Sequence, residues 1–108
     1  MSETIPELDA GSFDAAVAAP GVAVVDFWAP WCGPCRSMAP VFESAANAMS
    51  GQARFCKVNV DEAPAVAARL GIRSIPTLVV FRDGRPAETL VGLQRPADFL
   101  AAVRRHLP

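Results

Sequence analysis

The segment VAVVDFWAPWCGPC, residues 22–35, is the most informative part of the chain about its fold, because it joins a strand pattern directly to a helix pattern. Residues 22–28 are apolar on both faces of a strand, with Asp26 as the exception. Such a strand lies in the centre of a sheet covered on both sides, since a sheet with one face in water alternates polar and apolar residues. After Pro34, apolar residues recur at steps of three and four, which predicts a helix with the inward stripe Cys35, Met38, Phe42, Ala45 and Met49.

The flanking sequence continues this alternation of strands and helices. The Asp83-Gly84 step is a strong hairpin signal, and Pro86 suits only an edge strand. The pattern predicts an α/β fold with a mixed sheet and helices on both faces. Its remaining segments are a helix over 13–19, a strand over 53–60, a helix over 65–70, strands over 77–81 and 88–91, and a helix from Pro96 onward.

Composition and charge narrow the class of protein. The chain has 108 residues, 52% of them hydrophobic and 19% charged, which predicts one folded domain over residues 1–108. A net charge of -1 offers no field that attracts nucleic acid or anionic lipid. The first residues do not resemble an export signal, and no apolar run is long enough to span a membrane. We therefore expect a cytoplasmic monomer that binds neither nucleic acid nor membrane.

The Cys32-Gly33-Pro34-Cys35 motif lies between a buried strand and a helix, a context typical of thiol redox sites. Cys32 stands at the helix start, where unpaired N–H groups and the helix dipole favour thiolate over thiol. We expect Cys32 to be the nucleophile, with an exposed sulfur. Cys35 lies one turn further on, on the inward stripe, and is predicted to be the resolving thiol.

Two charged residues lie within the predicted central strands. Asp26 is the single charge in an apolar run, so burial should raise its pKa toward the range useful for proton transfer. We predict that Asp26 accepts the proton of Cys35; the alternative is a hydrogen-bonded structural residue. Lys57 is expected to pair with Asp26, the alternative being a lysine that reaches solvent at a strand end.

Three alternative functions remain open for the cysteine-containing site: a zinc site, a non-catalytic binding module and a hydrolase. Cys32, Cys35, Cys56 and His106 add up to the four ligands of a structural zinc site, although Cys56 lies on a buried strand and is expected to be an inert core residue. A non-catalytic binding module could use the same apolar surface. A Cys-His hydrolase is disfavoured, because the sole histidine, His106, has no evident route to Cys32.

Residues 26–35, residues 71–77, Gly84 and Val91-Gly92 follow a known family pattern. With these motifs, the chain resembles the thioredoxin family along nearly its whole length. This resemblance implies a thioredoxin fold with a sheet of about five strands. The Gly33-Pro34 spacer is similar to that of the reducing branch of the family.

The resemblance also implies a function and a substrate surface. The function would be general protein-disulfide reduction, with thioredoxin reductase as electron donor and disulfide-containing proteins as clients. No cofactor or metal would be required beyond the redox-active disulfide Cys32–Cys35. Ile75-Pro76 would be a cis peptide bond beside the cysteines. The substrate surface would comprise Trp31, Gly33, Pro34, Ile75, Pro76 and Gly92.

Overall fold

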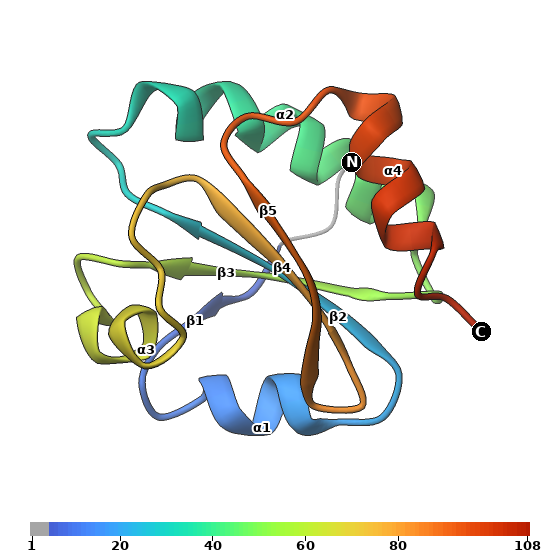
Figure 1. The fold of residues 1–108 in the computed structure, drawn as a ribbon, viewed down its shortest axis with the longest axis horizontal. Coiled ribbons are helices and arrows are strands. Elements are labelled where there is room, and N and C mark those ends of the chain that lie inside the picture. Colours follow the sequence, from blue (N-terminus) through green and yellow to red (C-terminus); the bar gives the residue numbers. More distant parts are fainter. Residues whose placement is uncertain (1–4) are drawn as a thin grey trace.

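The computed structural model describes residues 5–108. Within this range, strands and helices alternate along most of the chain (Figure 1). Their bounds are β1 Glu7–Leu8, α1 Phe13–Ala18, β2 Val22–Trp28, α2 Gly33–Ala48, β3 Arg54–Asn59, α3 Pro64–Arg69, β4 Thr77–Arg82, β5 Arg85–Val91 and α4 Pro96–Arg104.

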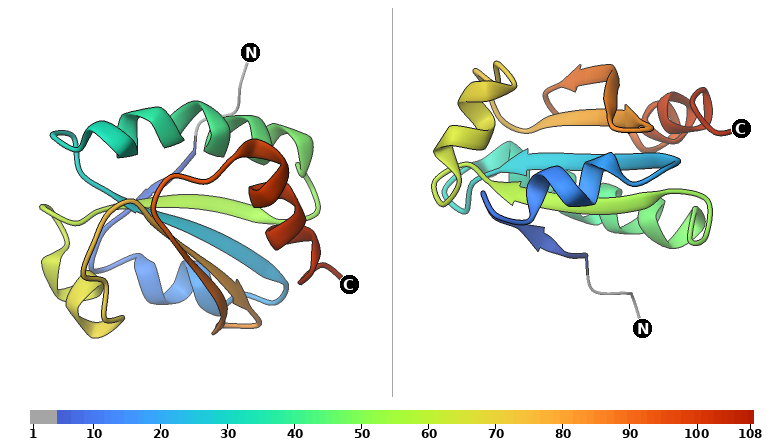
Figure 2. Two further views of the ribbon diagram at one scale, coloured as in Figure 1. Left: turned by 45° about the horizontal axis from the view of Figure 1, so that its top comes forward. Right: turned by 90° about the horizontal axis from the view of Figure 1, so that it is seen from below.

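The strands form one mixed sheet in the order β1-β3-β2-β4-β5. β1, β3 and β2 run parallel to one another, and β4 and β5 complete the sheet antiparallel to their neighbours. The right-hand view of Figure 2 shows this order, from β1 at the bottom to β5 at the top. β5 is an edge strand, as Pro86 predicted.

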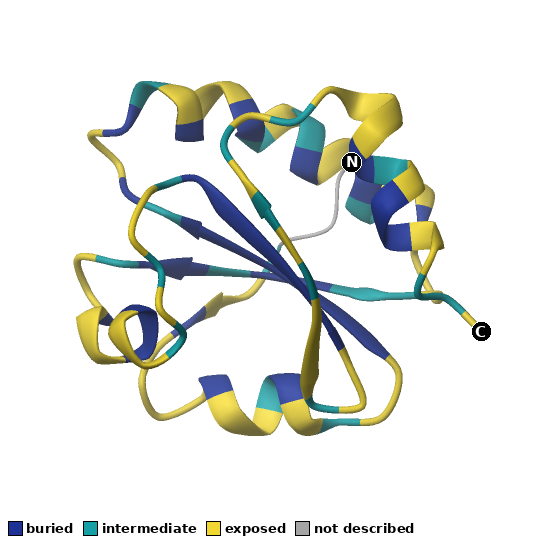
Figure 3. Cartoon of the chain, in the orientation of Figure 1, coloured by how far each residue is buried: buried dark blue, intermediate teal, exposed yellow. Residues whose placement is uncertain are grey.

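Two apolar layers hold the helices against the sheet. α2 and α4 pack on one face through Met38, Phe42 and Phe99, and α1 and α3 pack on the other through Phe13 and Val66. β2 and β4 are buried along most of their length, whereas β5 is largely exposed (Figure 3). The predicted α/β fold with helices on both faces is confirmed, and no helix among residues 5–108 is long and apolar enough to cross a membrane.

Among the strands of residues 5–108, β1 is the one that the sequence pattern did not identify. It contains only two residues, so no alternation of polar and apolar side chains is visible. Its pairing with β3 aligns Glu7 with Lys57 and Leu8 with Val58. This short strand brings Glu7 to the same row of the sheet as Lys57 and Asp26, because β3 in turn aligns Lys57 with Asp26.

Arg54 ties the start of β3 to the end of α1. Its guanidinium donates to the carbonyl oxygens of Pro20 at 2.7 Å, Ala19 at 2.9 Å and Ala16 at 3.4 Å. The last carbonyl groups of a helix have no partner within the helix, so a cation at this end stabilises them. Arg54 thus takes the place of a local capping motif.

Replacing Arg54 with methionine should lower the free energy of unfolding by about 2 kcal/mol, because several charge-assisted hydrogen bonds are lost together. Denaturant unfolding followed by circular dichroism measures the change. Arg82→Met is the matched control, since Arg82 is exposed at the end of β4. Equal effects of the two substitutions would contradict the capping role of Arg54.

Candidate active site

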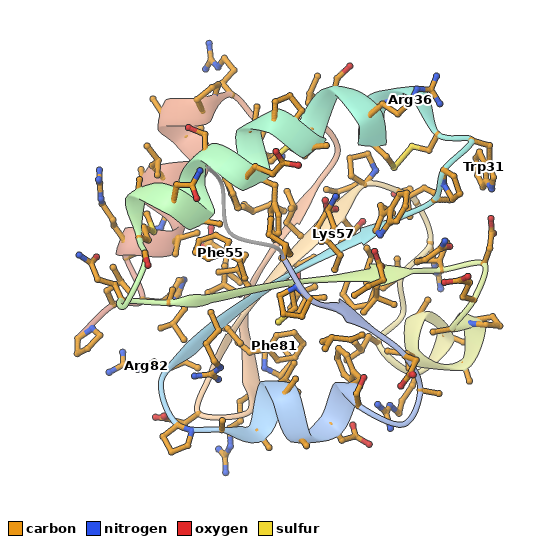
Figure 4. All side chains as sticks on the ribbon, turned by 180° about the vertical axis from the view of Figure 1, so that it is seen from behind. Trp31, Arg36, Phe55, Lys57, Phe81 and Arg82 are labelled. Atoms are coloured by element: carbon orange, nitrogen blue, oxygen red, sulfur yellow. A yellow bond between two sulfur atoms is a disulfide. The ribbon has the colours of Figure 1, made fainter. Side chains whose placement is uncertain are left out.

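Cys32 and Cys35 form a disulfide at the start of α2, directly after the loop that leaves the carboxyl end of β2. Figure 4 shows this bond near Trp31 and Arg36. Cys32 is the N-cap residue of α2, and the backbone N–H of Cys35 donates to Cys32 Sγ at 3.1 Å. The sulfur of Cys32 therefore faces the positive end of the helix, as the motif predicted.

Burial does not distinguish the two cysteines in this disulfide state. Cys32 is 4% exposed and Cys35 3%, so the expectation of an exposed Cys32 is wrong. Apolar side chains close around both residues: Ala29 packs in the same cluster, together with Trp28, Val60 and Ile75. The chemical difference between the two sulfurs comes from their positions relative to the helix end.

The loop before β4 lies against the disulfide. Ile75-Pro76 is a cis peptide bond, as the resemblance implied, and the Ile75 carbonyl oxygen lies 3.7 Å from Cys32 Sγ. Gly92 donates its N–H to the Pro76 carbonyl at 2.8 Å and has a φ of 89°, a conformation that glycine adopts without strain. The Ile75-Pro76 turn thus lies beside Cys32, and Gly92 is hydrogen-bonded to that turn.

The surface near the dithiol is apolar and exposed. Trp31 precedes Cys32 and is 68% exposed, while Val91 and Leu93 flank Gly92 at 63% and 53%. The Trp31 indole Nε1–H donates to Asp61 at 2.8 Å, which holds the ring in one orientation. Asp61 is not among the residues that the sequence predicted for the site. Its position two residues after the end of β3 was a usable signal, because the carboxyl ends of parallel strands meet at one edge of a sheet.

Gly33 and Pro34 are the first residues of α2, and Pro34 occupies a first-turn position that needs no N–H donor. Gly33 is half-buried and Pro34 exposed. The expected surface residues Trp31, Gly33 and Pro34 therefore follow one another around Cys32, on the side of the disulfide formed by the start of α2.

Asp26 is 1% exposed in the middle of β2. The pKa of Asp26 is raised to about 7. Burial is the largest cause, the Lys57 ammonium opposes the rise, and the Glu7 carboxylate adds to it. Among residues 5–108, Asp26 Oδ1 has no hydrogen-bond partner, so this carboxyl oxygen is not fixed by a neighbouring donor. A carboxyl group with this pKa can accept or release a proton near neutral pH.

Lys57 lies beside Asp26 in the register of the sheet, on the face that α2 covers (Figure 4). Within residues 5–108, however, no ion pair of 4.0 Å or less joins Lys57 to Asp26, in contrast to the expected pairing. The Lys57 ammonium instead lies 5.1 Å from the centre of the Trp28 ring. The Trp28 Nε1–H in turn donates to Glu7 at 2.9 Å.

The four residues considered as zinc ligands are not brought together. Cys56 is a buried free thiol in the layer under α1 and α3, whereas Cys32 and Cys35 lie at the start of α2. His106 Nε2 lies 2.8 Å from Glu88 Oε1, at the end of α4. No group of three or more possible metal ligands lies together among residues 5–108. Burial raises the pKa of the Cys56 thiol, which favours the inert protonated form.

The family model described as thioredoxin matches residues 4–105. The chain belongs to the thioredoxin family. A thioredoxin from Staphylococcus saprophyticus is 47% identical over 87 residues, covering 81% of this chain and 84% of the relative. Thioredoxin 1 from Synechococcus elongatus is 50% identical over 84 residues, covering 78% of each chain.

Solved thioredoxin structures share the whole fold. The thioredoxin of Malassezia sympodialis has a TM-score of 0.89 and 35% identity, covering 98% of this chain and 94% of its own. A mutant thioredoxin from Halobacterium salinarum has a TM-score of 0.88 and 34% identity, covering 95% and 90%. With a redox-active Cys32–Cys35 pair on this fold, the chain is a thiol-disulfide oxidoreductase that works by dithiol-disulfide exchange.

Proposed function

We propose that this thioredoxin is a general reductant of protein disulfides in the cytoplasm, with thioredoxin reductase as its electron donor. The observation that carries the proposal is the Cys32–Cys35 disulfide at the start of α2, with the cis Ile75-Pro76 bond beside it. The single domain spans residues 1–108 and acts as a monomer. A buried free Cys56 fits a reducing compartment, where unpaired thiols persist.

The reaction begins from the reduced pair. The Cys32 thiolate attacks one sulfur of the client disulfide, a mixed disulfide forms, and the other client sulfur leaves as a thiolate that takes up a proton. The N–H of Cys35, 3.1 Å from Cys32 Sγ, supports Cys32 as the attacking group because it stabilises negative charge on that sulfur.

The second step releases the client. Cys35 gives its proton to Asp26, attacks Cys32 Sγ, and displaces the second client sulfur, which leaves as a thiolate. The client disulfide has then gained two electrons, and Cys32 and Cys35 are joined in a disulfide. Asp26 is suited to this proton transfer because burial raises its pKa to about 7, and Lys57 limits the rise. The reductase returns two electrons, so the thiols themselves carry the electrons and no cofactor or metal is needed.

The client chain is proposed to lie across Trp31, Gly33, Pro34, Ile75, Pro76 and Gly92. The 68% exposure of Trp31 and its hydrogen bond to Asp61 support a preorganised apolar contact next to Cys32. The backbone at Ile75 lies against Cys32 Sγ, so an extended client could pair with it in the manner of an added strand. Leu93 enlarges the apolar rim beside Gly92.

Reduction of insulin disulfides tests the function and its donor together. The protein should accelerate insulin precipitation by dithiothreitol, and it should couple oxidation of NADPH to insulin reduction when a bacterial thioredoxin reductase is added. The Cys32→Ser/Cys35→Ser double variant should be inactive in both assays. No acceleration over the protein-free blank would exclude a disulfide reductase.

A further inference from the structure

Asp26 and Lys57 lie in register on adjacent strands but do not form an ion pair. Residues in register on adjacent parallel strands lie about 4.8 Å apart, and a lysine side chain is long enough to bridge that gap. A direct ion pair would hold the Asp26 carboxylate in its charged form and make it a poor proton acceptor. Among residues 5–108 no such ion pair is formed, so another contact keeps the Lys57 ammonium away.

That contact is the Trp28 indole. Trp28 and Asp26 are two residues apart on β2, so their side chains point to the same face of the sheet. The Trp28 ring lies over the Lys57 ammonium at 5.1 Å, a cation–π contact that competes with Asp26 for the same charge. The position of the indole therefore decides how strongly Lys57 acts on Asp26.

Glu7 holds the indole. It lies on the edge strand β1 in register with Lys57, and its Oε2 accepts the Trp28 Nε1–H at 2.9 Å. Glu7 is exposed, while Trp28 and Lys57 are half-buried. The Glu7 carboxylate therefore lies between these two side chains and solvent. Across the sheet the order of groups is Glu7, Lys57 and Asp26, with Trp28 joined to the first two.

We propose that Glu7 is a positioning residue of the dithiol site: it holds the Trp28 indole across the Lys57 ammonium, and so keeps Asp26 able to accept the proton of Cys35. This inference rests on the proposed role of Asp26 in the reaction. The groups that face this region are Lys57 from β3, Glu7 from β1 and the Cys32–Cys35 pair from α2, while β4 presents the apolar Leu78 opposite Asp26.

Two substitutions of Glu7 separate its hydrogen bond from its charge. Glu7→Gln keeps an oxygen that accepts the indole N–H but removes the charge, so the Asp26 titration midpoint should fall by only about 0.3 pH units. Glu7→Ala releases the indole and lets Lys57 approach Asp26, so the midpoint should fall by about one pH unit. Glu43→Gln removes an exposed carboxylate on α2 and serves as the control, with no change expected.

The measurement is a carboxyl-carbon NMR titration of Asp26 in the oxidised protein, where the disulfide removes the coupled titration of the thiols. The indole N–H signals report the orientation of Trp28, one of two tryptophans in the chain; Trp31→Phe assigns them. Equal midpoints in Glu7→Ala and Glu7→Gln, or an unmoved Trp28 signal in Glu7→Ala, would overturn the positioning role. These readouts need no substrate, so an inactive protein in the insulin assay would reject the proposed function separately.

Discussion

Cys35→Ser should convert the protein from a reductase with turnover into a trap for its clients. Cys32 keeps its place at the start of α2 and still attacks the client disulfide, but no neighbouring thiol resolves the mixed disulfide. Loss of an intramolecular displacement should reduce turnover by at least about 10³-fold. Incubation with oxidised insulin, followed by non-reducing gels and mass spectrometry, should reveal a stable adduct at Cys32.

Cys32→Ser is the matched control for the trap. It retains Cys35, which is equally buried but lies inside the first turn of α2. We expect neither turnover nor an adduct, because Cys35 does not occupy the N-cap position that stabilises a thiolate. Adducts that form in Cys32→Ser and not in Cys35→Ser would exchange the two roles. Since both residues are almost fully buried, this experiment tests the helix-end argument without a contribution from unequal exposure.

Asp26→Asn should stabilise the protein at alkaline pH while it slows the reaction. The pKa of Asp26 is raised by burial from 3.8 to about 7. Between these two pH values, the folded protein keeps a proton on Asp26 that the unfolded chain releases. That difference corresponds to about 4 kcal/mol of lost stability once the carboxylate is charged in both states. A neutral amide avoids most of this loss, and we expect a gain of about 3 kcal/mol at about pH 8.

The gain should depend on pH in a definite direction. Below the unfolded pKa of 3.8, Asp26 is neutral in both states, and the variant should match the parent protein. Stability of the parent then falls relative to Asp26→Asn as pH rises toward about 7, and the difference stays constant above that. Urea unfolding at several pH values measures it. A difference that does not grow between these limits would contradict the raised pKa.

Asp26→Asn should also slow the release of the client from the mixed disulfide. Without a proton acceptor at position 26, Cys35 must lose its proton to solvent, so decay of the mixed disulfide should slow by at least about tenfold near neutral pH. The deficit should shrink as pH rises, because hydroxide removes the proton from Cys35 directly. Rapid-mixing experiments with a fluorescent disulfide peptide measure the decay. An unchanged pH profile would return Asp26 to a purely structural role.

The most local features could be predicted best from the sequence. The strand over residues 22–28 and the hairpin about Asp83-Gly84 follow from residue periodicity and turn chemistry, which act over a few neighbours. The position of Cys32 at the helix start follows equally from its adjacency to Gly33-Pro34. β1 could not be predicted, because two residues have no period.

The chemical groups of the site could be predicted from the order of residues alone: a dithiol at a helix start and a carboxyl group in an apolar strand. The neighbours of these groups, in contrast, depend on how the whole chain folds. The tertiary structure buried Cys32 under Ile75 and Val60, joined Trp31 to Asp61, and put Trp28 between Glu7 and Lys57. The reason is physical: thiolate stabilisation at a helix end is local, whereas contacts across a sheet depend on strand register, which segments distant in the sequence set together.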